Sequence, residues 1–307
     1  MSSFSADWLT LREPADRRAR AVQLTRLVVE ALPGGSPEIP PDRSAVTSPE
    51  TRPHPVAVDR VTDPVVAVDR SDAPADERRA RVVDLAGGTG ANVRYLTPLF
   101  RTRPEWLLVD HDPALLNVAR ERLGGRVLTR VADLSDRRGR EVLVSGRDLV
   151  TASALLDLVS DAWLHRLLSA CREAGAATLF ALNYDGRMAC TPEDPEDERV
   201  RGLVNRHQRG DKGFGQALGP DAAHRTARIL GGLGYTVVRE RSDWVIGADE
   251  AALQSALIDG WAGAAVEMSP SDKSVIRAWQ QRRLAHLSAE RSMLIVGHED
   301  VAGLPLP

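Results

Sequence analysis

The chain has 307 residues, of which 43% are hydrophobic, and its 40 basic and 43 acidic residues give a formal net charge of −3. This length lies at the upper limit of one domain, so one domain with elaborations is expected rather than two equal ones. The near-neutral charge provides no global field that favours nucleic acid or a membrane. A small-molecule partner is therefore expected, and a homodimer is compatible with this composition.

The cysteines and the N-terminus indicate in which cellular compartment the protein is expected. Cys171 and Cys190 are the two cysteines and form no Cys-x-x-Cys pair, so neither a disulfide framework nor a metal site is expected. No run of eighteen apolar residues occurs, and the N-terminus lacks a basic region followed by an apolar stretch. We therefore expect a cytoplasmic protein.

The first 77 residues divide into two segments. Residues 1–32 carry apolar side chains at roughly helical spacing and predict a helical leader of one or two amphipathic helices. Residues 33–77 are rich in proline and predict a linker or an ornamented loop. Val-Ala-Val-Asp-Arg occurs there twice, at 56–60 and 66–70, so an ordered strand pair is the alternative to disorder.

Residues 78–307 alternate short apolar runs with helical segments, which predicts one α/β domain. Strands are expected at 81–85, 106–110, 126–132, 148–153, 177–183, 235–241 and 292–297, and helices at 91–100, 113–123, 161–174 and 220–233. Two insertions are expected, at 186–218 and at 249–290, and the second has the pattern of two helices. The predicted fold is a doubly wound, mostly parallel seven-stranded sheet with N-terminal helices and a C-terminal helical insertion.

A glycine-rich turn follows the first predicted strand. The strand Arg81-Val-Val-Asp-Leu runs into Ala86-Gly87-Gly88-Thr89-Gly90 and then into a helix. Glycines there let the backbone approach a ligand and leave amides at a helix N-terminus. The spacing differs from the Gly-x-Gly-x-x-Gly of pyrophosphate-binding turns, so a pyrophosphate is not the favoured ligand.

Acidic residues also end the next two predicted strands. Asp110 lies twenty-six positions after Asp84, where a carboxylate can accept hydrogen bonds from both hydroxyls of a ribose. The third strand ends before Asp133 and Leu134, where a carboxylate can accept the amino group of adenine. Three acids at successive strand ends predict a nucleoside site.

Asp84-Leu-Ala-Gly-Gly-Thr-Gly resembles motif I of the class I methyltransferases that use S-adenosylmethionine (SAM). The resemblance covers residues 81–185 well and the remainder loosely, and the family usually has glycine where this chain has Ala86. It implies that SAM is the cofactor and S-adenosylhomocysteine the product. The residues that it assigns to cofactor binding are Asp84, Ala86, Gly87, Gly88, Gly90, Asp110, His111, Asp133, Leu134 and Ser153.

Residues after the fifth predicted strand are candidates for the acceptor side, because loops at strand ends usually carry substrate residues. Asn183, Tyr184, Asp211 and Lys212 are predicted to bind substrate. His207 and Tyr184 are the predicted catalytic residues, with His207 as general base. The alternatives are a solvated histidine and a tyrosine that only packs its ring.

Two further features have alternative interpretations. Asp157, after the fourth predicted strand, either caps the next helix or faces the pocket. Trp244, Trp261 and Trp279 fit a core between inserted helices, and the alternative is an aromatic cage for a quaternary amine.

The predicted activity is methyl transfer from SAM to an oxygen, nitrogen or carbon nucleophile of a small molecule. Such a displacement requires mainly orientation and, for some acceptors, removal of a proton. No Asn-Pro-Pro-Tyr follows the fourth strand, which argues against methylation of nucleic acid or glutamine. The alternatives are a catalytically degenerate SAM-binding regulatory or partner subunit, and a nicotinamide oxidoreductase. The oxidoreductase is disfavoured by the turn spacing and by the lack of a Tyr-x-x-x-Lys sequence.

Overall fold

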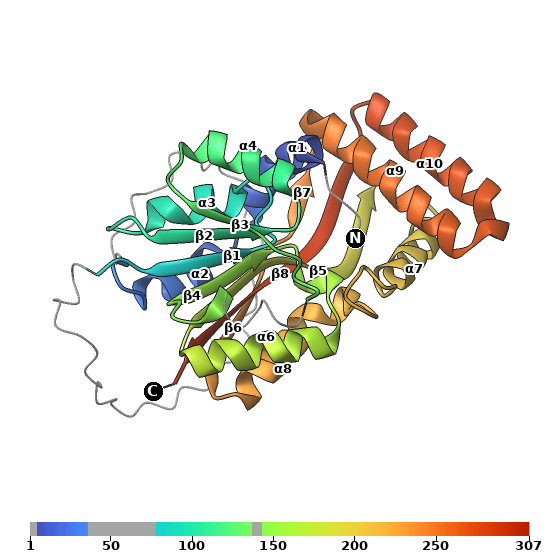
Figure 1. Ribbon diagram of the computed structural model, residues 1–307. Coiled ribbons are helices and arrows are strands. Elements are labelled where there is room, and N and C mark those ends of the chain that lie inside the picture. Colours follow the sequence, from blue (N-terminus) through green and yellow to red (C-terminus); the bar gives the residue numbers. More distant parts are fainter. Residues whose placement is uncertain (1–4, 36–77, 137–142, 307) are drawn as a thin grey trace.

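The apolar runs of the main domain form the strands of one sheet in the computed structural model, which describes residues 5–35, 78–136 and 143–306 (Figure 1). The strands are β1 (Arg81–Leu85), β2 (Glu105–Asp110), β3 (Leu128–Val131), β4 (Leu149–Ser153), β5 (Ala177–Thr191), β6 (Tyr235–Arg241), β7 (Trp244–Ile246) and β8 (Met293–Pro305). Most of the predicted linker, with both Val-Ala-Val-Asp-Arg copies, lies outside the described residues.

The strand order is β3-β2-β1-β4-β5-β8-β6, and β7 pairs separately with β8. β1 to β5 run parallel to their neighbours, whereas β8 runs antiparallel to both β5 and β6. This is the sheet order of class I methyltransferases, and the predicted α/β fold is confirmed. Because the order reverses between β1 and β4, their carboxyl ends form the crevice in which open α/β sheets bind ligands.

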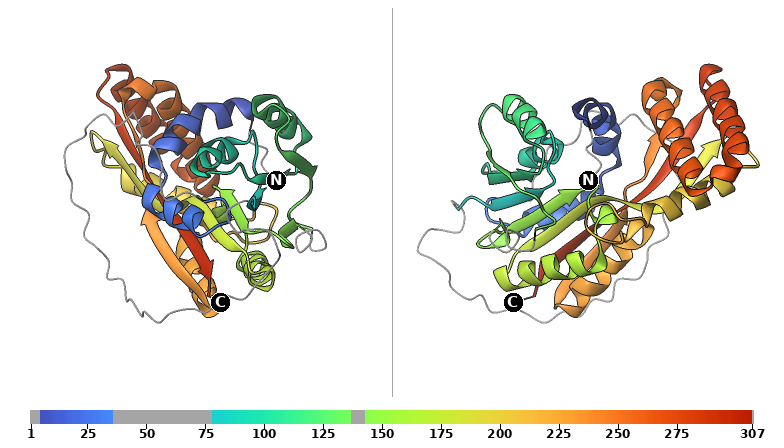
Figure 2. Two further views of the ribbon diagram at one scale, coloured as in Figure 1. Left: turned by 90° about the vertical axis from the view of Figure 1, so that its left-hand side faces the viewer. Right: turned by 45° about the vertical axis from the view of Figure 1, so that its right-hand side comes forward.

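Helices cover both faces of the sheet, as Figures 1 and 2 show. One face packs against α2 (Val22–Glu30), α3 (Ala91–Leu96) and α4 (Pro113–Leu123), and the other against α6 (Asp161–Ala174) and α8 (Ala222–Gly232). The predicted helix at 91–100 is shorter, because α3 gives way to a 3-10 turn at Thr97–Leu99. Within the described ranges, no helix has the length and apolar character needed to cross a membrane.

A third apolar cluster lies at the end of the molecule where β5, β7 and β8 extend beyond the other strands (Figure 1). It is built with α1 (Ala6–Ala19), α7 (Asp197–Gln208), α9 (Ala251–Met268) and α10 (Lys273–Ser288). The N-terminal helices and the two C-terminal helices were predicted, whereas α7, β7 and the extensions of β5 and β8 were not. The polar stretch after Asn183 resembles a turn, yet it pairs with β8 through two register shifts.

Candidate functional site

Backbone strain gathers where the strands end. Ala86, Ala154 and Leu182 have left-handed φ values of 52°, 52° and 54°, although none of them is glycine. They follow β1, follow β4 and lie within β5, respectively. Each such residue costs about 1–2 kcal/mol relative to ordinary backbone, and strain of this kind collects at functional sites. The same three residues line cavities at this edge of the sheet.

The turn after β1 requires glycine and is hydrogen-bonded to the end of β2. A Cβ atom on Gly87 would lie 2.0 Å from Cδ1 of Leu108, so a larger residue cannot occupy this position without displacing a neighbour. Gly88 has a φ of +53°, and its backbone amide donates a 2.9 Å hydrogen bond to Oδ2 of Asp110. Gly90 is the left-handed N-cap of α3. The turn is therefore a fixed cradle between two strand ends.

Replacing Ala86 by glycine is expected to raise the free energy of unfolding by about 0.5–1 kcal/mol, because the left-handed strain exceeds the entropy cost of glycine. Urea denaturation measures this difference. As a control, Ala227→Gly within α8 should lower the free energy of unfolding by about 0.5–1 kcal/mol. A less stable Ala86→Gly protein would show that the residue is not strained.

The first cavity lies over this turn and brings together a buried acid and a buried cation. Oδ1 of Asp84 accepts a 2.9 Å hydrogen bond from Asn92, whereas its Oδ2 is buried without a partner. Burial raises the pKa of Asp84 to about 7. Arg20 donates to Asn92 over 2.8 Å and stacks 4.4 Å above the ring of Tyr95, and its Nη2 has no partner. Unused polar atoms of both charges thus border one cavity.

The second cavity adjoins the first, with Ser153 lining both. Asp110, at the end of β2, is buried and accepts from the amides of Gly88 and Asp112 over 2.9 and 3.0 Å. His111 lies 3.2 Å from the same carboxylate. Since an ionised carboxylate has about four acceptor sites, Asp110 keeps capacity for a further donor.

The structure brings most of the predicted cofactor residues together. Asp84, Ala86, Gly87, Gly88, Asp110, His111, Leu134 and Ser153 line the first two cavities. Gly90 lines neither cavity and is the N-cap of α3. Asp133 is exposed and does not line either cavity, and its Oδ1 accepts from the amide of Ser135 over 2.8 Å, which holds its pKa below the usual value. Leu134, rather than Asp133, therefore borders the cavity after β3.

A third cavity of about 620 Å³ opens from the second, since Arg12, Ala154, Leu158 and Lys212 line both. Tyr184, His207, Asp211 and Lys212, four of the predicted acceptor-side residues, line it. Asn183 does not, because its buried amide donates to the carbonyls of Phe180 and Glu299. The part of the chain that the structure describes holds no cluster of three or more metal-ligating side chains.

The contacts of His207 and Tyr184 restrict what they can do. Nε2 of His207 lies 3.1 Å from Glu267, and its Nδ1 lies 3.4 Å from Nζ of Lys212. Both ring nitrogens are therefore engaged, which leaves the imidazole poorly placed to take a proton. The hydroxyl of Tyr184 donates to Asn205 over 2.8 Å, and burial raises its pKa well above the usual value. Tyr184 is therefore a wall of the cavity and not a base.

Asp157 lines the same cavity, and one of its two carboxylate oxygens has no partner among the described residues. The residue is 7% exposed, its Oδ1 is buried without a hydrogen bond, and burial raises its pKa to about 6. Ser160, and not Asp157, caps α6 by accepting from the amide of Trp163. Of the two interpretations that the sequence left open, the contacts favour the pocket.

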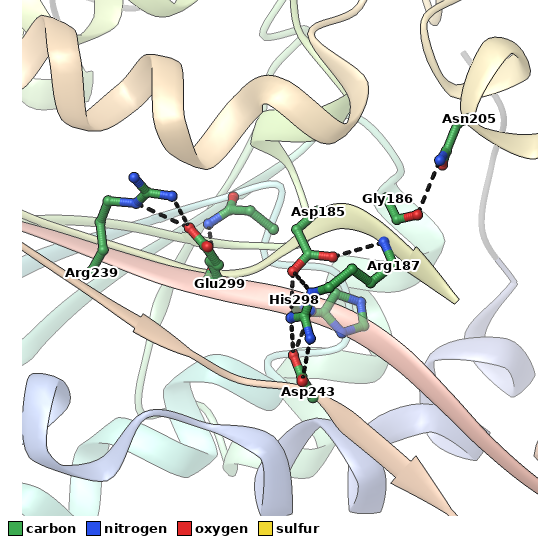
Figure 3. Close-up of polar contacts among 9 residues, drawn as sticks. Asp185, Gly186, Arg187, Asn205, Arg239, Asp243, His298 and Glu299 are labelled. Carbon is green, nitrogen blue, oxygen red and sulfur yellow. Dashed lines mark hydrogen bonds and ion pairs between the residues drawn. The ribbon is translucent and has the colours of Figure 1, made fainter. Parts of the chain in front are cut away.

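His298 is a cavity residue that the sequence analysis did not identify. Its backbone amide donates to Asp243, which pairs with Arg187 over 2.6 and 2.8 Å, and Arg187 also bonds to Asp185 (Figure 3). This network fastens β8 to β5 and holds the imidazole 4.9 Å from the ring of Trp244. Burial lowers the pKa of His298 to about 3, so the ring is neutral at physiological pH.

The three tryptophans Trp244, Trp261 and Trp279 do not lie at one site in the structure. Trp244 and Trp261 line the third cavity together with Trp8 of α1. Trp279 is fully buried, and its indole nitrogen donates to Asp197 over 2.7 Å. The first two therefore supply apolar cavity wall, whereas Trp279 belongs to the core between α7 and α10.

No protein-family model matches the chain, and no curated protein matches it. Among solved structures, the chain is similar to the YcgJ protein of Bacillus subtilis, with 12% identity over 75% of this chain and 93% of that one and a TM-score of 0.45. It is also similar to a cyclopropane synthase of Mycobacterium tuberculosis, with 9% identity over 73% of this chain and 78% of that one and a TM-score of 0.40. A further similar structure is phosphoethanolamine N-methyltransferase 2 of Haemonchus contortus, with 16% identity over 75% of this chain and 49% of that one and a TM-score of 0.39. The match spans about half of the Haemonchus enzyme. At these values the likeness concerns the fold alone.

Proposed function

We propose that this protein transfers a methyl group from SAM to a nucleophilic oxygen, nitrogen or carbon of a small molecule. The observation that carries the proposal is a chain of three adjoining cavities along the carboxyl ends of β1, β2, β4 and β5. The first has buried groups of both charges, the second has the acid of β2, and the third is large and mostly apolar. The order of the three cavities matches the amino acid end of SAM, its nucleoside and the methyl acceptor.

The residues present fit the cofactor. Asp84 and Arg20 have unpartnered buried atoms suited to the ammonium and carboxylate groups of the methionine end. Asp110 has acceptor capacity for a ribose hydroxyl, and Leu134 and Phe214 provide apolar surface for adenine. When bound, SAM supplies a methyl group that is already activated on a sulfonium. The protein then has to orient the acceptor and, where the nucleophile carries a proton, remove it.

Helix α1 covers the cofactor cavities. They measure about 70 and 100 Å³, whereas pockets for small molecules usually hold roughly 300–1,000 Å³. Leu9 and Arg12 of α1 line both, and Leu9 lies 2.9 Å from where a Cβ atom on Gly88 would stand. We infer that the side chain of Leu9 moves aside when SAM enters, while α1 stays in place.

SAM and S-adenosylhomocysteine are expected to bind the purified protein with micromolar dissociation constants and to raise its melting temperature, whereas NAD should do neither. Calorimetry gives the affinities directly. A folded protein that gives no binding heat with either ligand would exclude the proposed function. Binding of both ligands without turnover of any acceptor would instead favour the degenerate SAM-binding subunit.

Asp110→Ala is expected to weaken SAM binding by about 1–3 kcal/mol, because it removes an acceptor of the ribose and releases the amide of Gly88. Calorimetry on the variant measures the loss. Asp133→Ala is the matched control: this acid also follows a strand but lies outside the cavities, so the affinity should change by less than about 0.5 kcal/mol. A larger loss in the control than in Asp110→Ala would reverse the assignment.

A further inference from the structure

We propose that Asp157 accepts the proton of the methyl acceptor, and that this acceptor is an apolar molecule whose nucleophile is a neutral hydroxyl group. The inference rests on the proposed methyl transfer and narrows its substrate class. It follows from the unpartnered carboxylate of Asp157, from the charges near it and from the walls of the third cavity.

Asp157 lies where the acceptor and cofactor cavities meet. It belongs to the 3-10 turn Leu156–Leu158 directly after β4. Its neighbours Ala154 and Leu158 line both the second and the third cavity, whereas Asp157 lines the third. An acceptor bonded to Asp157 therefore lies beside the edge of the cofactor site.

The other acids that line the third cavity already have partners. Glu267 pairs with His207, and Oδ1 of Asp211 accepts from the amides of Gly213 and Gly215 over 2.7 and 3.1 Å. Asp157 keeps a buried oxygen with no donor. A buried acceptor without a donor is unfavourable by about 1–3 kcal/mol, so a ligand that supplies the donor gains binding free energy there.

The charges around Asp157 favour a neutral donor. Burial raises the pKa of Asp157, and three groups act against this effect: its own backbone amide, the guanidinium of Arg12, which pairs with Asp16 over 2.9 Å, and the ammonium group of Lys212. An ammonium ligand would add a third cation to this group, and a carboxylate ligand would face the carboxylate of Asp157. A hydroxyl supplies the donor without adding charge, and the same two cations stabilise the negative charge that develops on its oxygen.

The part of the cavity wall that the tryptophans form suits an apolar body. Trp8, Trp244 and Trp261 line it from three separate elements, and the neutral His298 adds no charge. In the reaction, Asp157 takes the proton as the O–H bond breaks and the oxygen forms its bond to the methyl carbon. The bond between that carbon and sulfur breaks, and its electron pair stays on sulfur. The products are a methyl ether, S-adenosylhomocysteine and a protonated Asp157, which then releases its proton to water.

Three probes with one indole body test the binding part of the inference: tryptophol, tryptamine and indole-3-acetate carry a hydroxyl, an ammonium and a carboxylate. Calorimetry on the full chain saturated with S-adenosylhomocysteine should show tryptophol binding about tenfold more tightly than either charged probe. Asp157→Leu should abolish this preference and leave the affinity for S-adenosylhomocysteine unchanged. Glu267→Gln, at an exposed acid of the same cavity, should keep the preference.

The outcomes separate the inference from the function on which it rests. Loss of S-adenosylhomocysteine binding to the wild type would exclude the methyltransferase itself. Normal binding of that ligand, with tryptophol no tighter than the charged probes or equally tight in Asp157→Leu, would overturn the inference alone.

A labelling experiment tests the proton transfer. With methyl-labelled SAM and a solvent extract of cells as the acceptor pool, we expect label in a methyl ether. Asp157→Asn should slow the labelling about 100-fold with the affinity for SAM unchanged. Label in a methylamine or a methyl ester, or equal rates for the two proteins, would overturn the inference. No labelled product from a wild type that binds SAM would count against the proposed function.

Discussion

Asp300→Asn is expected to lower the free energy of unfolding by about 3–5 kcal/mol, the usual effect of leaving a buried charge without its partner. Asp300 is fully buried on β8, and its Oδ1 and Oδ2 accept from the amides of Leu182 and Ala21 over 2.7 and 3.0 Å. The guanidinium of Arg20, itself 3% exposed, lies 3.6 Å from Oδ2. An asparagine would point an N–H group at one of the two amides and would remove the ion-pair partner of Arg20.

Urea denaturation measures this loss, and the adjacent residue provides the control. Glu299 pairs with Arg239 at the surface (Figure 3), and exposed pairs contribute roughly 0–1 kcal/mol. Glu299→Gln should therefore change the free energy of unfolding by less than about 1 kcal/mol. Equal losses in the two variants would show that the burial of Asp300 does not matter.

The position of Asp300 shows how the site depends on the fold. One carboxylate holds the junction of α1 and α2 through Ala21, the strained backbone of β5 through Leu182, and the cation of the first cavity through Arg20. Helix α1, which covers the cofactor cavities, and β5, which borders the acceptor cavity, are thus fixed to the same point of β8. We expect Asp300→Asn to weaken SAM binding as well.

The elements around the cofactor cavities could be predicted because their signals are local. Helices α4 and α6 begin at the residues expected from the sequence, since Asp112 and Ser160 cap them, and they end at the left-handed Gly124 and Gly175. The buried strands are short apolar runs between such helices. The predicted cofactor residues lie in the last positions of these strands or within five residues after them and therefore reach one edge of the sheet.

The acceptor side could not be predicted in this way, because its parts are far apart in the sequence. His298 reaches the cavity through the antiparallel pairing of β8 with β5, and Arg12 reaches it from α1. Helix α7 buries only a narrow apolar stripe that includes Val200 and Leu203, so its charged sequence resembles a loop. The choice of His207 as base relied on its place after a strand, which carries no information about Glu267, the residue that engages its ring.

Asp84→Asn is expected to make the ligand-free protein more stable than the wild type at pH 8, by up to about 4 kcal/mol. Burial raises the pKa of Asp84 in the folded protein to about 7 from the ordinary value of 3.8. Between these values the folded state holds a proton that the unfolded state has lost. The stability of the wild type therefore falls as the pH rises from about 4 to 7, and it stays at the lower level above pH 7.

Asparagine does not ionise, so the variant avoids this loss, and its advantage should disappear near pH 4. Urea denaturation of both proteins at pH 4.5 and pH 8 without SAM tests the sign, and Asp7→Asn, at an exposed acid of α1, should change stability little at either pH. A variant no more stable than the wild type at pH 8 would contradict the burial argument.

The Asp84→Asn variant should also bind SAM more weakly, because the unpartnered oxygen of Asp84 borders the cavity proposed for the ammonium group. Greater stability together with weaker binding would show that this carboxylate is buried for the ligand and not for the fold.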